Sequence, residues 1–200
     1  MKLRMLTLGD YQTNCYLVSD SAGNTAVIDP GYEPQTILAR LREEKLRPCA
    51  ILLTHGHFDH VGGVKALAEA AHLPVWLNEK ELTLPPSLTE GPLYYTDGYG
   101  EGDTVTVGGL QFTVLHTPGH TPGGICFLHE NDRLLFSGDT LFCLTAGRTD
   151  LPGGDSAALM QSLDRLRKLE GDYKVYPGHE RATSLDAERK RNFYMRRVGK

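Results

Sequence analysis

Thr54-His55-Gly56-His57-Phe58-Asp59-His60 is the segment around which this chain is arranged. It follows the short apolar run 50–53, which is typical of a buried strand, and it precedes Gly62-Gly63 and a helical pattern. We therefore expect it at the carboxyl end of a strand, where α/β folds place their chemistry. Its imidazole and carboxylate groups suit zinc, iron or manganese, so the segment predicts a metal site.

The spacing within this segment indicates that it serves two neighbouring metal ions. Side chains alternate along an extended backbone, so we expect His55, His57 and Asp59 to point to one side. We expect His60 to turn away as the following helix begins. The competing interpretation is a solvated turn that happens to carry four polar side chains.

Composition limits the kinds of protein that this chain can be. Its 200 residues, 40% hydrophobic and 23% charged, predict one globular domain, 1–200, with a sizeable core. The net charge of −4 argues against a nucleic-acid partner and favours a small-molecule substrate. No apolar run reaches the roughly eighteen residues that cross a bilayer, and no signal peptide is evident, so we expect a cytoplasmic protein without a membrane partner. The sequence leaves the oligomeric state open.

The four cysteines, Cys15, Cys49, Cys126 and Cys143, are widely spaced and form no C-x-x-C motif. Each lies in an apolar or strand-like run, which predicts buried free thiols in a reducing compartment. Cys143 lies four residues after a candidate metal ligand, and we interpret it as a packing residue.

Hydrophobic periodicity predicts two blocks of strands, each followed by helices. The first block has strands at 3–8, 15–19 and 25–29 in an antiparallel meander, a helix from Pro34 to before Pro48, strand 50–53, helix 64–71 and strand 74–77. The second has strands at 104–107, 111–115, 124–128 and 133–136, a helix capped by Asp155, strand 173–176 and a terminal helix over 186–197. This order predicts an α/β fold, a four-layer αβ/βα sandwich.

Residues 78–102 are the least regular part of the chain, with a short helix expected near 80–84. Loops of this length often cover active sites, so Tyr94, Tyr95 and Tyr99 either line a substrate entrance or pin the loop to the surface.

Three later segments also place a His or Asp just after a strand and beside glycine. They are Thr117-Pro118-Gly119-His120-Thr121, Ser137-Gly138-Asp139-Thr140 and Tyr176-Pro177-Gly178-His179-Glu180. Glycine permits sharp turns and close approach of a ligand. Together with the first segment they offer seven nitrogen and oxygen donors, which is enough for two ions that share one carboxylate.

These motifs, in this order, resemble the metallo-β-lactamase fold superfamily, and within it the glyoxalase II-like hydrolases. The resemblance covers nearly the whole chain. It implies that His55, His57 and His120 hold one metal, that Asp59, His60 and His179 hold the other, and that Asp139 bridges them. By the same pattern His116 is not a ligand, and His72 and His129 are interpreted as surface histidines.

The resemblance implies two divalent ions, most simply zinc, with iron or manganese as alternatives. The implied activity is hydrolysis of an acyl thioester, similar to S-lactoylglutathione, or of a related ester by a hydroxide that the metals share. Asp59 would orient this hydroxide and pass its proton to the leaving group. A lactone is a further possible substrate.

Two features set this chain apart from glyoxalase II itself. It ends soon after its seventh candidate ligand, without the family's C-terminal helical extension, so we expect weak glutathione binding. The segment Gly147-Arg148-Thr149-Asp150 resembles one that is shared with persulfide dioxygenases, which use a single iron, and this gives the alternative function. Arg148 and Tyr176 are candidate substrate contacts, although Arg148 and Asp150 could instead form a structural pair. The basic cluster Arg189, Lys190, Arg191, Arg196 and Arg197 either meets an anionic substrate or is a solvated helix face.

Overall fold

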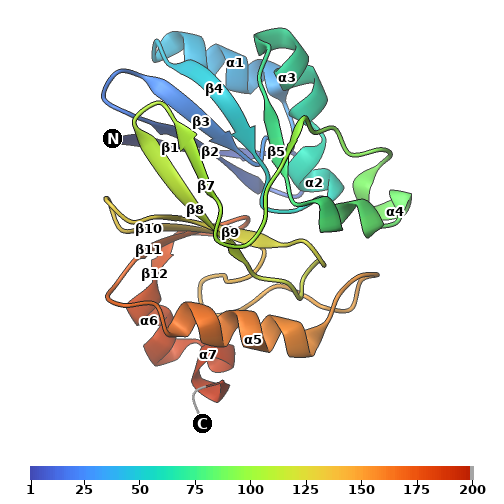
Figure 1. Cartoon of the computed structure of the whole chain (residues 1–200), viewed down its shortest axis with the longest axis vertical. Coiled ribbons are helices and arrows are strands. Elements are labelled where there is room, and N and C mark those ends of the chain that lie inside the picture. The colour runs from blue at the N-terminus through green and yellow to red at the C-terminus, as the bar shows by residue number, and fades with distance from the viewer. Residues whose placement is uncertain (199–200) are drawn as a thin grey trace.

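The computed structural model describes residues 1–198 and shows two sheets packed face to face, with helices on both outer faces (Figure 1). The first sheet has the order β1-β2-β3-β4-β5-β6, and the second has the order β12-β11-β10-β9-β8-β7. The predicted four-layer αβ/βα sandwich is confirmed.

The first sheet opens as the predicted antiparallel meander and then becomes parallel from β3 to β6. Helices α1 and α3 cross over between its parallel strands. The elements of this half are β1 (Lys2–Leu8), β2 (Thr13–Ser19), β3 (Asn24–Ile28), α1 (Pro34–Glu43), β4 (Arg47–Leu52), α2 (Phe58–Val61), α3 (Val64–Ala71), β5 (Val75–Leu77), the 3-10 helix η1 (Glu79–Thr83), α4 (Pro86–Thr89) and β6 (Asp97–Gly98).

The second sheet is antiparallel except for the pair β10 and β11. Asp155 caps α5 as predicted, because its carboxylate accepts from the backbone N–H groups of Ala157 and Ala158. The elements are β7 (Thr104–Val107), β8 (Leu110–His116), β9 (Ile125–His129), β10 (Leu134–Gly138), α5 (Ser156–Arg167), β11 (Lys174–Pro177), β12 (Thr183–Ser184), α6 (Leu185–Arg191) and α7 (Phe193–Arg197).

Three hydrophobic clusters fill the spaces between the four layers. Residues such as Tyr16, Phe112 and Phe136 form the cluster between the sheets. A second cluster joins the first sheet to α1 and α3, and a third joins the second sheet to α5, α6 and α7. Each sheet is therefore buried on both faces, which explains why β2, β3, β9 and β10 are buried along almost their whole length.

The predicted terminal helix is wrong in one respect, because Asn192 divides it. The Asn192 side chain accepts from the N–H groups of Tyr194 and Met195 and begins α7 there.

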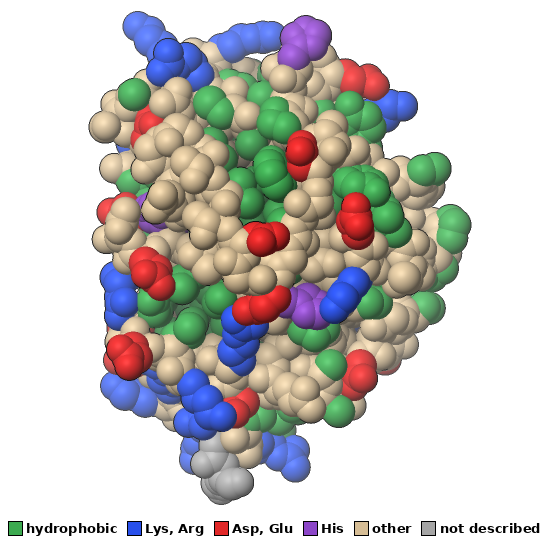
Figure 2. Space-filling view, in the orientation of Figure 1, with side chains coloured by type: hydrophobic (Ala, Val, Ile, Leu, Met, Phe, Trp, Pro, Cys, Tyr) green, Lys and Arg blue, Asp and Glu red, His purple; other side chains and the backbone are tan. Residues whose placement is uncertain are grey.

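The same residue divides the basic cluster between α6 and α7. Arg189 hydrogen-bonds backbone carbonyls near the end of α5, including those of Arg167 and Gly171, which is a structural role. On the face drawn in Figure 2, acidic and basic side chains are interspersed rather than gathered into one basic patch.

The loop tyrosines pin the 78–102 segment to the protein. Tyr99 is 6% exposed, and its hydroxyl bonds the backbone N–H and C=O groups of Leu53. Tyr94 and Tyr95 pack against the cluster outside the first sheet.

None of the helices among residues 1–198 is both long and apolar enough to cross a membrane.

All four cysteines are free, as predicted, but only Cys15 and Cys126 are buried. Cys49 and Cys143 are partly exposed, which corrects the prediction of four buried thiols. The Arg181 Nε–H donates to Cys143 Sγ at 3.3 Å, so this thiol lies under a polar side chain.

Candidate metal centre

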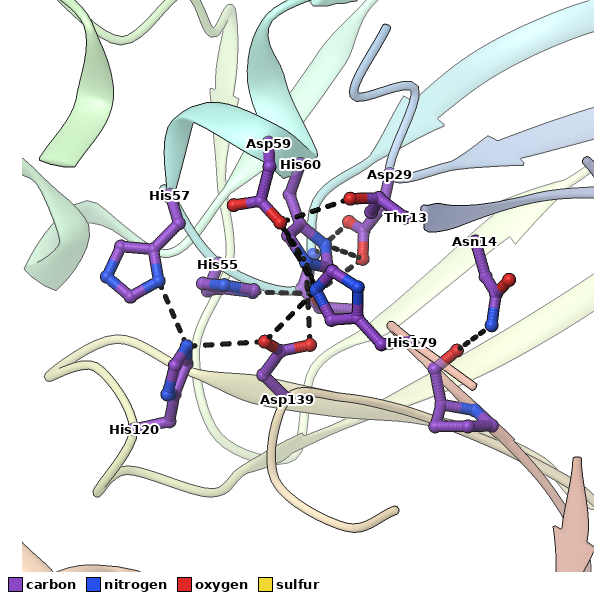
Figure 3. A network of polar contacts seen from close by, with 12 residues as sticks. Thr13, Asn14, Asp29, His55, His57, Asp59, His60, His120, Asp139 and His179 are labelled. Carbon is purple, nitrogen blue, oxygen red and sulfur yellow. Dashed lines mark hydrogen bonds and ion pairs between the residues drawn. The ribbon is translucent and has the colours of Figure 1, made fainter. Parts of the chain in front are cut away.

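All seven predicted donors meet at one edge of the sandwich, between the two sheets (Figure 3). His55 and His57 follow β4, and α2 carries Asp59 and His60. His120, Asp139 and His179 lie in the loops after β8, β10 and β11. Segments that follow strands of both sheets thus place the seven donor side chains close together, as expected where strands end.

The first group of donors is His55, His57 and His120, all buried. One ligand atom from each lies within 4.8 Å of the others. The Nδ1 atom of His57 lies 2.9 Å from Nε2 of His120. Three imidazoles at this separation form a nitrogen site of the kind that binds zinc or iron.

The second group is Asp59, His60 and His179, whose ligand atoms meet the same 4.8 Å limit. His179 Nε2 lies 3.2 Å from Asp59 Oδ2 and 3.3 Å from His60 Nε2. The alternation expected for the first segment ends at His57, because α2 begins at Phe58. Asp59 therefore faces the second group, rather than sharing the side of His55 and His57.

Asp139 lies between the two groups. Its Oδ2 is 3.4 Å from His120 Nε2 and 3.5 Å from His179 Nε2, and its Oδ1 is 3.4 Å from His60 Nε2. One carboxylate within reach of donors from both groups has the position of a bridging ligand.

Two atoms of this cluster fit a metal site in particular. His55 Nε2 and Asp139 Oδ1 are buried and have no hydrogen-bond partner within the described part of the chain. Buried polar atoms without partners are costly and uncommon in native proteins. Ligation of metal ions accounts for both atoms, so the residues present fit two divalent ions.

The electrostatics of the first donor group and of Asp139 favour the protonation states that metals need, whereas in the second group burial lowers the pKa of His60 and His179 but neighbouring carboxylates outweigh it and raise both. Burial, together with the neighbouring histidines, holds the pKa of His55 well below 6.5, and burial with His120 lowers the pKa of His57 to about 4. Burial alone would raise the pKa of Asp139, but His60 and His120 outweigh it and keep the pKa below its usual value. Neutral imidazoles and ionised carboxylates are the states that bind metal ions.

Asp29, which the sequence reasoning missed, holds the segment in place from behind. Its carboxylate accepts from Thr54 N–H at 2.7 Å, from Thr54 Oγ1 at 2.6 Å and from His60 Nδ1 at 2.9 Å. A hydrogen bond at Nδ1 leaves Nε2 of His60 free to act as a ligand. Asp29 follows β3, the parallel neighbour of β4, so its position at a carboxyl strand end was an available signal.

Three further contacts orient the other donors. Thr13 Oγ1 donates to Asp59 Oδ2 at 3.1 Å. His120 Nδ1 bonds the carbonyl of Arg148 at 2.8 Å, and His179 Nδ1 bonds that of Tyr11 at 3.1 Å. Backbone carbonyls carry no sequence signature, so the contacts of His120 and His179 were not predictable from residue types.

The sequence-family model of the metallo-beta-lactamase superfamily matches residues 8–179 of this chain. The chain belongs to this superfamily. It is 35% identical to the hydroxyacylglutathione hydrolase GloC of Haemophilus influenzae, over 98% of both chains. Among solved structures it resembles TTHA1623 in a di-iron-bound form, with a TM-score of 0.86 and 42% identity over 96% of this chain and 99% of that one. It also resembles ETHE1 from Myxococcus xanthus, with a TM-score of 0.84 and 33% identity over 100% of this chain and 86% of that one.

The superfamily match, together with relatives named as metallo-hydrolases, identifies the chain as a metallo-hydrolase with a His and Asp metal-binding cluster. The superfamily explains why the donors come from loops of both sheets. The ligand pattern is spread along the chain, and the fold assembles it.

The remaining candidate residues have more ordinary surroundings. Arg148 forms a bidentate pair with Asp150, at 2.7 and 2.8 Å, and both side chains are exposed. Tyr176 packs between the sheets, with its ring stacked on Phe136 and at an angle to Tyr16. This packing accounts for Tyr176, and we do not retain it as a substrate contact.

The other histidines lie outside the cluster. His116 Nε2 bonds the carbonyl of Pro122 at 3.0 Å. His72 is exposed at the end of α3, as predicted. The interpretation of His129 as a surface residue is wrong. It is 2% exposed because it ends β9 rather than lying in a turn, and Nδ1 bonds the Gln111 carbonyl at 2.7 Å.

Proposed function

We propose that this metallo-hydrolase holds two divalent ions and cleaves an acyl thioester similar to S-lactoylglutathione. The observation that carries the proposal is Asp139, whose carboxylate lies within 3.5 Å of donors from both groups. The likeness to the hydroxyacylglutathione hydrolase GloC supports the thioester. Zinc is our first choice of metal, and the di-iron form of TTHA1623 supports iron as the alternative.

Bound ions at this centre would supply a water-derived nucleophile near neutral pH and polarise the scissile carbonyl. The protein's own contribution is to hold the donors and to move a proton. Asp59 Oδ2 is fixed by Thr13 Oγ1 at 3.1 Å and lies 3.2 Å from His179. The other oxygen, Oδ1, is turned away from these contacts in Figure 3, and we assign to it the transfer of a proton towards the leaving group. A thiolate leaves readily, so no strong acid is needed.

The Arg148–Asp150 pair bears on how the substrate is held. The two hydrogen bonds leave less of the guanidinium for a substrate carboxylate, so we assign the pair to the shape of its loop. The Arg148 carbonyl also bonds His120 Nδ1, so the same loop supports the first donor group.

A persulfide dioxygenase with a single iron is the second candidate. It is favoured by residues 147–150 and by the likeness to ETHE1 from Myxococcus xanthus. The second donor group counts against it, because a single ion among His55, His57 and His120 would leave Asp59, His60 and His179 without a ligand role.

A paired assay separates the two functions. Zinc-loaded and iron-loaded protein are each given S-lactoylglutathione, with thiol release followed, and glutathione persulfide, with oxygen consumption followed. We expect thiol release from the zinc form and no metal-dependent oxygen uptake. Oxygen uptake by the iron form, with no thiol release from either form, would overturn the proposal. A lactone is assayed in parallel, and faster lactone than thioester cleavage would replace the substrate class.

A further inference from the structure

Glu81 is a buried acidic residue that neither the ligand motifs nor the proposed chemistry uses. It lies on η1, in the 78–102 segment, and it is 0% exposed although its neighbours Glu79 and Lys80 are exposed. A carboxylate is rarely fully buried without a specific partner. Its position therefore calls for a physical reason.

The two oxygens of Glu81 each accept from a backbone amide of a different metal-ligand loop. Oε2 accepts from Gly56 N–H at 2.6 Å, and Oε1 accepts from Gly123 N–H at 2.5 Å. Gly56 separates His55 from His57, and Gly123 lies three residues after His120. Both are short, charge-assisted hydrogen bonds, so the carboxylate ties a loop after β4 to the loop between β8 and β9.

The glycines at these two positions give independent support for the contact. A Cβ on Gly123 would lie 2.8 Å from Glu81 Oε1 and 2.9 Å from its Cγ. A Cβ on Gly56 would lie 3.1 Å from Glu81 Oε2. Glycine thus lets the carboxylate lie directly against both backbones.

We propose that Glu81 is a positioning residue that sets the separation of the His55–His57 loop from the His120 loop, and thereby the geometry of the three-histidine donor group. The inference rests on the proposed metal centre. His57 Nδ1 and His120 Nε2 are 2.9 Å apart, one from each tied loop, so a shift of either loop changes this spacing directly. Metal–ligand distances tolerate deviations of only about 0.2 Å, so a change in the spacing of the two nitrogens affects binding.

The carboxyl group of Glu81 offers one acceptor oxygen to each of the two amides. Glutamine keeps the shape of Glu81 but offers one oxygen and one NH₂ group, so one backbone N–H would face another donor. Glu81→Gln should release one of the two loops while filling the same space. Glu79→Gln is the matched control, because it removes the same charge from an exposed position on the same helical turn.

The test is cobalt binding to metal-free protein, followed by visible absorption and by competition with a chelating dye. We expect at least one binding step to weaken about tenfold in E81Q, with an altered cobalt spectrum, and neither change in E79Q. A purely structural role would lower the melting temperature and leave the affinity and spectrum of the folded protein unchanged. Cobalt affinity and spectrum equal to those of E79Q would overturn the proposal, whatever the substrate proves to be.

A measurement on the unaltered protein covers the case in which E81Q does not fold. Amide hydrogen exchange of zinc-loaded, ¹⁵N-labelled protein reports Gly56 and Gly123 separately. We expect both amides to exchange slowly, as engaged buried donors do. Rapid exchange of either amide would show that the carboxylate does not hold that loop, and would refute the role assigned to Glu81.

Discussion

Replacing Asp29 by Asn should weaken metal binding at the second donor group without unfolding the protein. Asp29 has a positive φ of 49°, a conformation that Asn tolerates better than most residues. Asn also keeps the shape of the carboxylate. The change therefore isolates the loss of one acceptor oxygen and of the charge.

The size of the effect follows from the three hydrogen bonds that Asp29 accepts. Thr54 N–H and the Thr54 hydroxyl can adapt to an amide, but the His60 Nδ1 contact at 2.9 Å cannot if the NH₂ group faces it. His60 would then favour the tautomer with its proton on Nε2, which is its ligand atom. Loss of such an orienting partner costs roughly 10- to 100-fold in metal affinity, or about 1.4–2.7 kcal/mol.

Calorimetric titration of metal-free protein with zinc measures this effect. Asp20→Asn is the control, because the Asp20 carboxylate also accepts several backbone and side-chain N–H groups but lies far from the ligands in a β2–β3 turn. We expect D20N to keep the affinity of the unaltered protein. Unchanged zinc affinity in D29N would refute the assignment of Asp29 as the residue that orients His60.

Three other changes test the same centre. Asp139→Asn should lower metal affinity and hydrolysis more than about 100-fold with little loss of stability, whereas exposed His72→Ala should change neither, as elemental analysis and thiol-release assays would show. Gly178→Ala should abolish tight metal binding, because the added Cβ would lie 2.2 Å from Asp139 Oδ1. Gly100→Ala is the control, because the nearest neighbour of its added Cβ lies at 4.0 Å. Equal zinc affinities of the two variants would contradict this expectation. Metal-free protein should lose stability as pH falls from about 6.5 to 4. In this range the unfolded state binds a proton at His57 and the folded state does not, because folding lowers the pKa of His57 to about 4. Urea unfolding of His57→Gln should show a shallower pH dependence.

The donor residues were predictable because their pattern is local. His55 to His60 follow a buried strand, and each later donor follows another strand beside a glycine, so residue type and position carried the inference. The resemblance divided the donors between two metals, and the structure brings together the groups that this division named. The assignment of each residue as a ligand stays a prediction until a metal is located.

The partners of the supporting residues were not predictable, because they are distant in sequence. Asp29 reaches His60 across 31 positions, and Glu81 reaches Gly123 across 42. The same reason applies to His129, whose burial depends on the Gln111 carbonyl of a neighbouring strand. Asn192 was a local signal of a different kind, a helix-capping residue within an apparently continuous helix.

Anomalous diffraction from crystals of zinc-loaded protein, collected on both sides of the zinc edge, tests the two-metal centre most directly. The account predicts two peaks on either side of Asp139, one among His55, His57 and His120, and one among Asp59, His60 and His179. A single peak among the first three histidines at saturating zinc, with the second group intact but without an ion, would contradict it.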